Sequence, residues 1–424
     1  MNTKQLIAQI KSGNLDNRLL DIYVDKQTLE YQKKRYVDAI KKYEYYYGAG
    51  EMKLFSAPGR SEVGGNHTDH QHGEVLAGAI NLDAIAVAKE IAEDEIRIVS
   101  GKVEHKVSLK DLSANKAEAG TTKALIKGVA AGFVERGYKI GGFCAYITSD
   151  VLIGSGMSSS AAFETLIGVI LSGLYNDMSI SDVEIAIIGQ YAETVYFGKP
   201  CGLMDQMACS VGSLVHIDFK NPKEPQIEKV DFDLEGFGYS LCITDTKGSH
   251  ADLTDEYAAV PAEMKQVANY FGKEVLVDVT MEELLDNIVE LRKTLSDRCV
   301  LRALHFLNEN ERVKKEVDAL KNTDMADFLS TVKASGNSSY KYLQNVYSNK
   351  DTEHQNVSLA LALSEMLLGE EGACRVHGGG FAGTIQAFVR NEDVKEYQKS
   401  MDKVFGRDAC HALKIRKYGG IQVV

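Results

Sequence analysis

The order of hydrophobic and polar positions along the chain predicts helices and strands in both halves. Residues 1–48 carry apolar side chains at helical spacing among charged ones, and Gly48 ends that pattern. A second helical pattern covers 121–135, and an apolar run over 161–171 predicts a buried helix. Short apolar runs predict strands at 53–58, 84–88, 95–100 and 142–148. Because these strands surround the helices rather than alternating strictly with them, we expect an α+β fold rather than a doubly wound parallel sheet.

The segment 219–225 is the best candidate for a domain boundary. It carries two of the five prolines and separates a strand-like run from a new acidic stretch. We therefore expect two domains, at 1–222 and 223–424. The second domain also has mixed content, with helical patterns at 261–271, 282–294 and 300–320 and strand-like runs at 239–245, 385–389 and 421–424.

Composition and charge limit the classes of partner. Of the 424 residues, 44% are hydrophobic and 25% charged, values typical of a globular protein. The formal net charge of -12 disfavours a nucleic acid or an anionic membrane as partner, because either surface would repel the chain. No segment has the length of a membrane span or the apolar core of a signal peptide. Seven cysteines without a CxxC pair fit reduced thiols, and we expect a cytoplasmic protein.

A glycine- and serine-rich loop directly precedes the apolar run at 161–171. Glycine allows backbone turns in which successive N–H groups point at one anion, and the helix that follows would present its positive N-terminal end to the same anion. The serine hydroxyls can cap the helix, contact phosphate or ligate Mg²⁺. A phosphate site and an ordinary serine-capped helix are equally good interpretations of this loop alone. The candidate phosphate-binding residues are Gly154, Ser155, Gly156, Met157, Ser158, Ser159, Ser160 and Ala161.

A second glycine-rich segment covers 57–73, directly after a predicted strand. Its Arg60 can neutralise a phosphoryl group, and Asp69 can accept hydrogen bonds from a polyol. The histidines at 67, 70 and 72 also suggest a metal site, although their spacing matches no closed zinc pattern. A solvated polar loop without a role is the third interpretation.

Two further segments add candidate chemistry. Residues 375–383 hold four glycines within six positions, which predicts either a tight turn or a close approach of the backbone to a ligand. Taken singly, Glu193 and Asp205 are ordinary carboxylates on a helix surface. Beside a phosphate loop, the pair would serve as Mg²⁺ ligand and general base.

Taken in order along the chain, these segments resemble the three motifs of the GHMP small-molecule kinases, and in particular those of the galactokinases. Residues 58–69 resemble the sugar-binding signature, which begins Pro-Gly-Arg and continues through His-Thr-Asp. Residues 154–161 resemble the phosphate loop, with Met157 in place of leucine, and 378–383 resemble the third, glycine-rich turn. The segment 201–206 is similar to the one that supplies the galactokinase catalytic aspartate, so the resemblance covers nearly the whole chain.

The resemblance implies a fold and an activity. The fold would have an N-terminal domain of the ribosomal-protein-S5-like type, a C-terminal α+β domain and an active site in the cleft between them. The activity would be transfer of the γ-phosphoryl group of ATP, with Mg²⁺, to the anomeric hydroxyl of a hexose. The expected partners are the sugar and ATP, and we expect a monomer, although the sequence does not reveal the oligomeric state.

The resemblance also implies roles for individual residues. Asp205 would take the proton of the sugar hydroxyl and Arg60 would stabilise the transferring group, while Ser160 and Glu193 would ligate Mg²⁺. The backbone of 154–161 would hold the phosphates. The residues expected to contact the sugar are Asn66, His67, Asp69, Gly202 and Tyr257.

One departure from the family pattern bears on the substrate. Galactokinases carry glutamate where this chain has Asn66, and that glutamate is expected to bind the sugar's 6-hydroxyl. An amide can still bond a hydroxyl, and it would tolerate a carboxylate at C6 that glutamate would repel. We therefore favour galactose, with galacturonate or another C6-altered sugar as the alternative. A kinase-like sugar sensor without catalysis is a further alternative, which the retention of Arg60, Glu193 and Asp205 disfavours.

Overall fold

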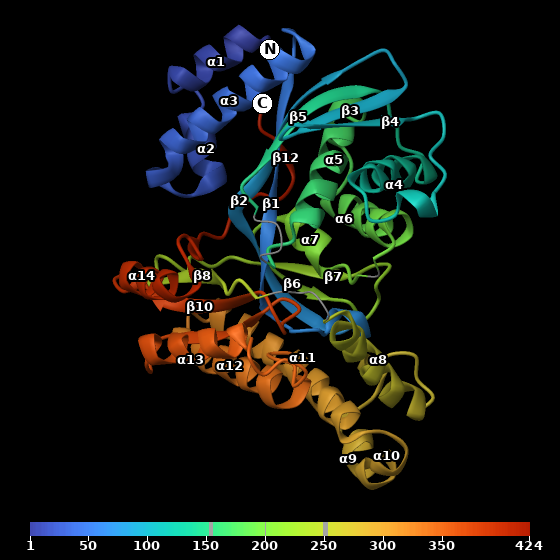
Figure 1. The fold of residues 1–424 in the computed structure, drawn as a ribbon, viewed down its shortest axis with the longest axis vertical. Helices are drawn as coiled ribbons and strands as arrows, with labels where there is room; N and C mark the ends of the chain where they lie inside the picture. The colour runs from blue at the N-terminus through green and yellow to red at the C-terminus, as the bar shows by residue number, and fades with distance from the viewer. Residues whose placement is uncertain (152–155, 200, 249–252) are drawn as a thin grey trace.

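Two β-sheets, each covered by helices, form the upper and lower parts of the molecule (Figure 1). The computed structural model describes residues 1–151, 156–199, 201–248 and 253–424. The upper sheet is ordered β12-β1-β2-β5-β3-β4, and β6 and β7 continue it beside the first half of β2. Only the β3–β5 pairing is parallel among the strand pairs described. The strands are β1 (Lys53–Gly64), β2 (Glu74–Glu90), β3 (Glu95–Ser100), β4 (Val103–Ser108), β5 (Phe143–Ser149), β6 (Leu214–Asp218), β7 (Gln226–Val230) and β12 (Ile421–Gln422).

Helices cover both faces of the upper sheet. Successive side chains of a strand point to opposite sides, so each strand contacts both layers of helices. In β2, Ala84 and Ala86 pack with the helices of one face, whereas Ile85 and Val87 pack with those of the other. The first face carries α4 (Thr122–Glu135), α5 (Ser159–Tyr175), α6 (Asp182–Tyr191) and α7 (Met204–Val211). The second face carries α1 (Thr3–Lys11), α2 (Asp16–Tyr23) and α3 (Leu29–Tyr47).

The lower part is built on a four-stranded antiparallel sheet in the order β11-β8-β10-β9. Its strands are β8 (Tyr239–Asp245), β9 (Ala373–His377), β10 (Thr384–Arg390) and β11 (Cys410–Leu413). Its helices are α8 (Thr254–Tyr270), α9 (Met281–Asp286), α10 (Ile288–Thr294), α11 (Asp297–Lys321), α12 (Met325–Ser338), α13 (Asn356–Leu368) and α14 (Val394–Phe405). Short helical turns are η1 (Lys26–Thr28), η2 (Asp69–Gln71), η3 (Lys116–Glu118), η4 (Ala192–Phe197), η5 (Leu276–Asp278) and η6 (Ser339–Leu343).

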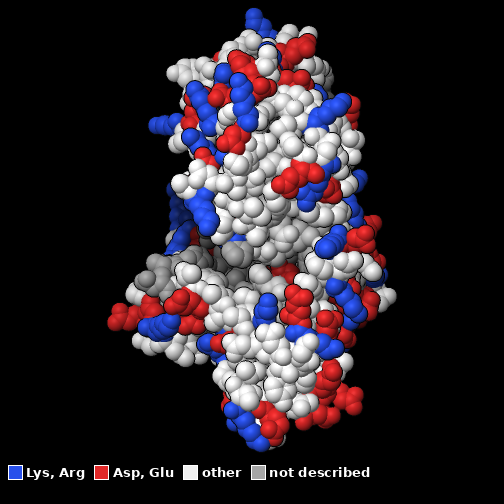
Figure 2. Space-filling view, turned by 90° about the vertical axis from the view of Figure 1, so that its right-hand side faces the viewer, with Lys and Arg blue, Asp and Glu red and all other residues white. Residues whose placement is uncertain are grey.

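The upper and lower parts share a hydrophobic core, and the chain passes between them from β7 to β8 and again from β11 to β12. Met157 and Leu76 from the upper part pack in one cluster with Phe328 and Phe388 from the lower part. The division expected after residue 222 falls between β6 and β7, which pair with each other, and the C-terminal β12 pairs with β1. The surface is hollowed where the two parts meet (Figure 2).

The expected α+β content is confirmed, and two expected helices differ in their bounds. The helix expected at 261–271 already begins at Thr254, so Pro261 lies inside α8. The helix expected at 282–294 is two helices, α9 and α10, because Asn287 ends the first and precedes the second. None of the helices described is long and apolar enough to cross a lipid bilayer.

Candidate active site

Strand β1 holds Arg60 against the loop that precedes α5. The backbone N–H of Arg60 donates to the carbonyl of Met157 at 3.2 Å, and its guanidinium donates to the carbonyl of Gly156. A side chain at Gly59 would place a Cβ 2.8 Å from the carbonyl oxygen of Met157, so the glycine allows this close approach. The glycine-rich segments around 60 and 156, which are far apart in sequence, therefore meet here.

Asp205 lies in the first turn of α7 and faces Arg60. The Arg60 Nε and Nη2 atoms lie 2.8 and 2.7 Å from Asp205 Oδ1, and the Ser158 hydroxyl donates to Oδ2 at 2.5 Å. Burial raises the pKa of Asp205, but the Arg60 charge and the Ser158 hydrogen bond outweigh it, so the pKa lies below its usual value. Asp205 is therefore an ionised carboxylate that Arg60 and Ser158 hold in place.

The N-terminal end of α5 has no side-chain cap from Ser158. Ser158, with φ 54°, precedes the helix and makes no capping bond, because its hydroxyl is used on Asp205. The N–H groups of the first turn, from Ser159, Ser160 and Ala161, come before the point at which intrahelical bonds begin. Such groups at the positive end of a helix bind phosphate well. Gly154 and Ser155, also expected to bind phosphate, lie outside the described residues.

Ser160 and Glu193, the expected Mg²⁺ ligands, contact each other. The Ser160 hydroxyl donates to Glu193 Oε1 at 3.1 Å, and Glu193 is held, only 2% exposed, on η4. One hydroxyl and one carboxylate, completed by substrate phosphates and water, are a donor set that suits Mg²⁺. Within the described ranges no group of three or more His, Cys, Asp or Glu side chains could hold a metal, and the histidines around 70 do not form one.

Three residues that the sequence analysis did not select surround Glu193. Its Oε1 also pairs with Lys199 Nζ at 3.2 Å, and its Oε2 accepts a hydrogen bond from Gln206 Nε2 at 2.8 Å. The same Gln206 nitrogen donates to Glu164 at 3.0 Å. Burial, together with repulsion from Glu193, raises the pKa of Glu164 well above its usual value. Glu164 had a sequence signal, because it lies four residues after Ser160 on the same face of an otherwise apolar helix.

Two of the expected sugar-binding residues contact each other directly. A Cβ at Gly202 would lie 1.8 Å from Asp69 Oδ2, so this carboxylate packs against the glycine backbone. His67 has φ 60° and donates from Nε2 to the carbonyl of Gly379 at 3.1 Å. Burial lowers the pKa of His67 to about 3, so the ring is neutral. Asp69, Gly202 and His67 lie on segments adjoining Asp205 and the third glycine-rich turn.

Tyr257 and Asn66 both donate hydrogen bonds to carbonyls of the third glycine-rich turn. The Tyr257 hydroxyl donates to the carbonyl of Gly380 at 2.7 Å. Asn66 is fully buried, and its amide donates to Glu62 at 2.9 Å and to the carbonyl of Gly378 at 2.8 Å. Its oxygen accepts hydrogen bonds from Ser339 at 3.1 Å and Asn345 at 2.9 Å. In this arrangement both hydrogens of the Asn66 amide nitrogen and both lone pairs of its oxygen are used within the protein.

His377 connects the third turn to the first segment. The N–H of Glu62 donates to its Nε2 at 3.2 Å, and Nδ1 lies 2.9 Å from the Thr384 hydroxyl. A Cβ at Gly156 would lie 2.7 Å from that same hydroxyl. The three glycine-rich segments thus converge on one site.

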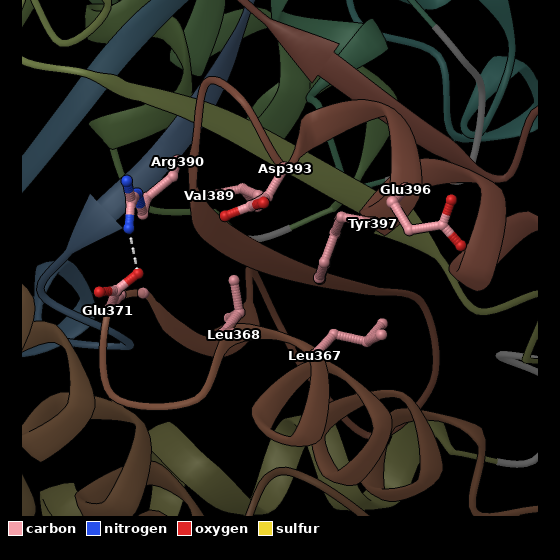
Figure 3. A pocket seen from close by; sticks show the side chains of 9 residues that line it. Leu367, Leu368, Glu371, Val389, Arg390, Asp393, Glu396 and Tyr397 are labelled. Carbon is pink, nitrogen blue, oxygen red and sulfur yellow. Dashed lines mark hydrogen bonds and ion pairs between the residues drawn. The ribbon is translucent and has the colours of Figure 1, made fainter.

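A separate surface pocket lies away from this site, between α13, β10 and α14 (Figure 3). It is lined by Leu367, Leu368, Tyr397 and the ion pair of Arg390 with Glu371. It contains none of the residues selected from the sequence.

The chain is similar to known proteins over most of its length. Residues 124–213 match the family described as GHMP kinases N terminal domain, and 41–90 match the galactokinase galactose-binding signature. Galactokinase of Glaesserella parasuis serovar 5 is 31% identical over 360 residues, 84% of this chain and 90% of that protein. Galactokinase of Streptomyces coelicolor is 27% identical over 372 residues, 87% of this chain and 92% of that protein.

Solved structures share the fold. Lactococcus lactis galactokinase, solved in complex with galactose, superposes with a TM-score of 0.78 at 22% identity, over 90% of this chain and 98% of that one. Mevalonate kinase of Methanococcus jannaschii superposes with a TM-score of 0.61 at 17% identity, over 86% of this chain and 99% of that one. The two-domain GHMP kinase fold expected from the sequence is confirmed.

Proposed function

The chain belongs to the galactokinase family of the GHMP kinases, and we propose that it transfers the γ-phosphoryl group of ATP to the anomeric hydroxyl of D-galactose. The products are galactose 1-phosphate and ADP. The observation that carries this proposal is the Arg60–Asp205 pair, which lies beside the N-terminal end of α5. A carboxylate, a guanidinium and a helix end that can hold phosphate are the parts a phosphoryl transfer needs.

The transfer step uses Asp205 and Arg60. The sugar's anomeric oxygen forms a bond to the γ-phosphorus while the bond from that phosphorus to the β–γ bridging oxygen breaks. The hydroxyl proton moves to the Asp205 carboxylate, and ADP leaves. Because the pKa of Asp205 is lowered, chiefly by Arg60 against the effect of burial, the carboxylate is a weak base and acts mainly by orienting the hydroxyl. The Arg60 guanidinium stabilises the charge on the transferring group.

Ser160 and Glu193 would hold Mg²⁺ together with the phosphates, which are bound by the first-turn N–H groups of α5. A divalent ion held there would supply positive charge to neutralise the phosphoryl oxygens. The contact between the two side chains supports this assignment, because it places both oxygens at one point.

We propose that Asp69, His67 and the backbone at Gly202 bind the sugar hydroxyls, in the cleft between residues 1–222 and 223–424. Tyr257 and Asn66 act through the turn at 378–380, whose carbonyls they bind. The acidic net charge and the interspersed Lys, Arg, Asp and Glu on the face in Figure 2 support a small-molecule substrate rather than a polyanionic partner. The seven free cysteines support a cytoplasmic location, and we propose a monomer.

The proposal is tested by measuring ADP release from Mg·ATP with a panel of free sugars that includes galactose, glucose and galacturonate. We expect turnover with galactose above the others. Faster turnover of galacturonate than of galactose would indicate that the substrate is a C6-altered sugar and not galactose. Absence of turnover with every sugar, in a protein that still binds ATP, would refute the kinase activity and favour a sugar sensor.

A further inference from the structure

Lys199 forms an ion pair at the oxygen that the proposed metal ion would need. Its Nζ lies 3.2 Å from Glu193 Oε1, the same oxygen that accepts the Ser160 hydroxyl at 3.1 Å. The backbone supports this position, because the Lys199 N–H donates to the Glu193 carbonyl at 3.1 Å. The Lys199 side chain is 62% exposed, whereas that of Glu193 is 3% exposed. The carboxylate is thus fixed and the ammonium group is free to move.

An ammonium group and a divalent cation cannot both occupy this oxygen without strong repulsion between them. When the carboxylate binds the divalent ion, the ammonium must leave. Lysine has a flexible four-carbon stem, so its head can move several ångströms without a change in the backbone. The Lys199 charge also acts on the reaction centre: burial raises the pKa of Asp205, and Arg60, Ser158 and, to a smaller extent, Lys199 lower it.

We propose that Lys199 exchanges partners when nucleotide binds, leaving Glu193 and donating to a non-bridging oxygen of the β- or γ-phosphoryl group. This inference rests on the proposed kinase function. In the free protein the ammonium neutralises Glu193, which shares Gln206 with a second carboxylate, Glu164. In the complex the divalent ion would neutralise Glu193 in place of the ammonium group. The phosphate oxygens would then be the anions available to Lys199. Lys199 then compensates phosphate charge together with Arg60.

The test compares Lys199→Met and Lys199→Arg with the wild type, and with Lys106→Met as a matched control. Lys106 pairs with Glu104 at 3.2 Å and is 54% exposed, but it lies on β4, away from the site. Two binding measurements need no turnover. Electron paramagnetic resonance measures the affinity for Mn²⁺ without nucleotide, and calorimetry measures the affinity for a non-hydrolysable ATP analogue with Mg²⁺.

Lys199→Met is expected to bind Mn²⁺ several-fold more tightly, because the competing ammonium is gone. It is expected to bind the analogue about 10- to 100-fold more weakly, the effect of losing one charge-assisted hydrogen bond. Lys199→Arg keeps the charge and should bind the analogue nearly as well as the wild type. Lys106→Met should leave both affinities unchanged.

Two results would overturn the inference. If Lys199→Met binds the analogue like the wild type, Lys199 does not contact phosphate. If Mn²⁺ affinity does not rise, Lys199 does not compete for Glu193. A failure of the kinase proposal is distinguishable, because the wild type would then bind neither the analogue nor its metal, or would bind both without phosphorylating any sugar.

Discussion

Substituting Gly202 by alanine tests how the sugar is held. The added Cβ would lie 1.8 Å from Asp69 Oδ2 and 2.5 Å from Asp69 Cγ, far inside van der Waals contact. The carboxylate would have to retreat by more than about 1 Å, a displacement that is costly in a catalytic site. Its retreat is restricted, because Asp69 Oδ1 accepts the N–H of His70 at 2.9 Å.

The magnitude follows from the hydrogen bonds that Asp69 would lose. A hydrogen bond from a hydroxyl to a carboxylate contributes about 1.5–3 kcal/mol, so the loss of one lowers kcat/KM for the sugar by about 10- to 100-fold. In the proposed site, Asp69 would bind the sugar in the ground state and in the transition state alike. We therefore expect most of the loss in the KM for the sugar, with a smaller change in kcat and none in the KM for ATP.

Steady-state kinetics with galactose and ATP measure these values for Gly202→Ala, Asp69→Ala and the double variant. If the methyl group acts by displacing Asp69, adding Gly202→Ala to the Asp69→Ala variant should raise the KM for the sugar little further. Gly50→Ala is the control, because its Cβ would meet only the flexible end of Lys89. A KM for galactose that stays at the wild-type value in Gly202→Ala would refute the placement of Asp69 in the sugar site.

Three further predictions address the base, the buried amide and pH. Asp205→Asn should lower kcat by about 10²- to 10⁴-fold while the affinity for an ATP analogue stays near that of the wild type; wild-type kcat would exclude its role. Asn66→Glu should lower the free energy of unfolding by about 3 kcal/mol or more, because it buries a second carboxylate beside Glu62. Unchanged stability with a shifted sugar preference would instead support a direct contact with sugar. Burial lowers the pKa of His67 to about 3, below the unfolded value near 6.5, so the unfolded chain takes up the proton first. Stability should therefore fall as pH drops from about 6.5 toward 3, and His67→Gln should reduce that slope in denaturant titrations; equal slopes would contradict this account.

The residues that we propose to act on the phosphoryl group were selected because each lies in a short motif with its own chemistry. In the structure Arg60 pairs with Asp205, and Ser160 donates a hydrogen bond to Glu193. Glu164 could also have been found, because a single acidic residue on an apolar helix, one turn after Ser160, faces the same side.

Residues whose partners are distant in sequence could not be predicted. Asn66 looked like a sugar ligand from its motif, but Ser339 and Asn345, its partners from η6 and beyond, lie 273 and 279 residues away. No local pattern indicates that these residues saturate its amide. Lys199 also gave no signal, because its partner Glu193 is fixed by the turn at η4 and not by helical spacing.

The fold shows the same division between local and long-range information. The apolar run at 84–88 predicted a strand, and in the structure this part of β2 buries side chains on both faces of the upper sheet. The pairing of β12 with β1 could not, since a short strand at the end of the chain does not indicate which sheet it joins. The same applies to β7, which follows the prolines at the expected boundary and still pairs with β6.

The most direct test of the central claim is to identify the product formed from galactose and Mg·ATP by NMR. We expect one phosphorylated sugar, with the phosphorus coupled to the proton on C1, formed in equal amount to ADP. A phosphate on any other carbon, or ADP formed without a phosphorylated sugar, would contradict it.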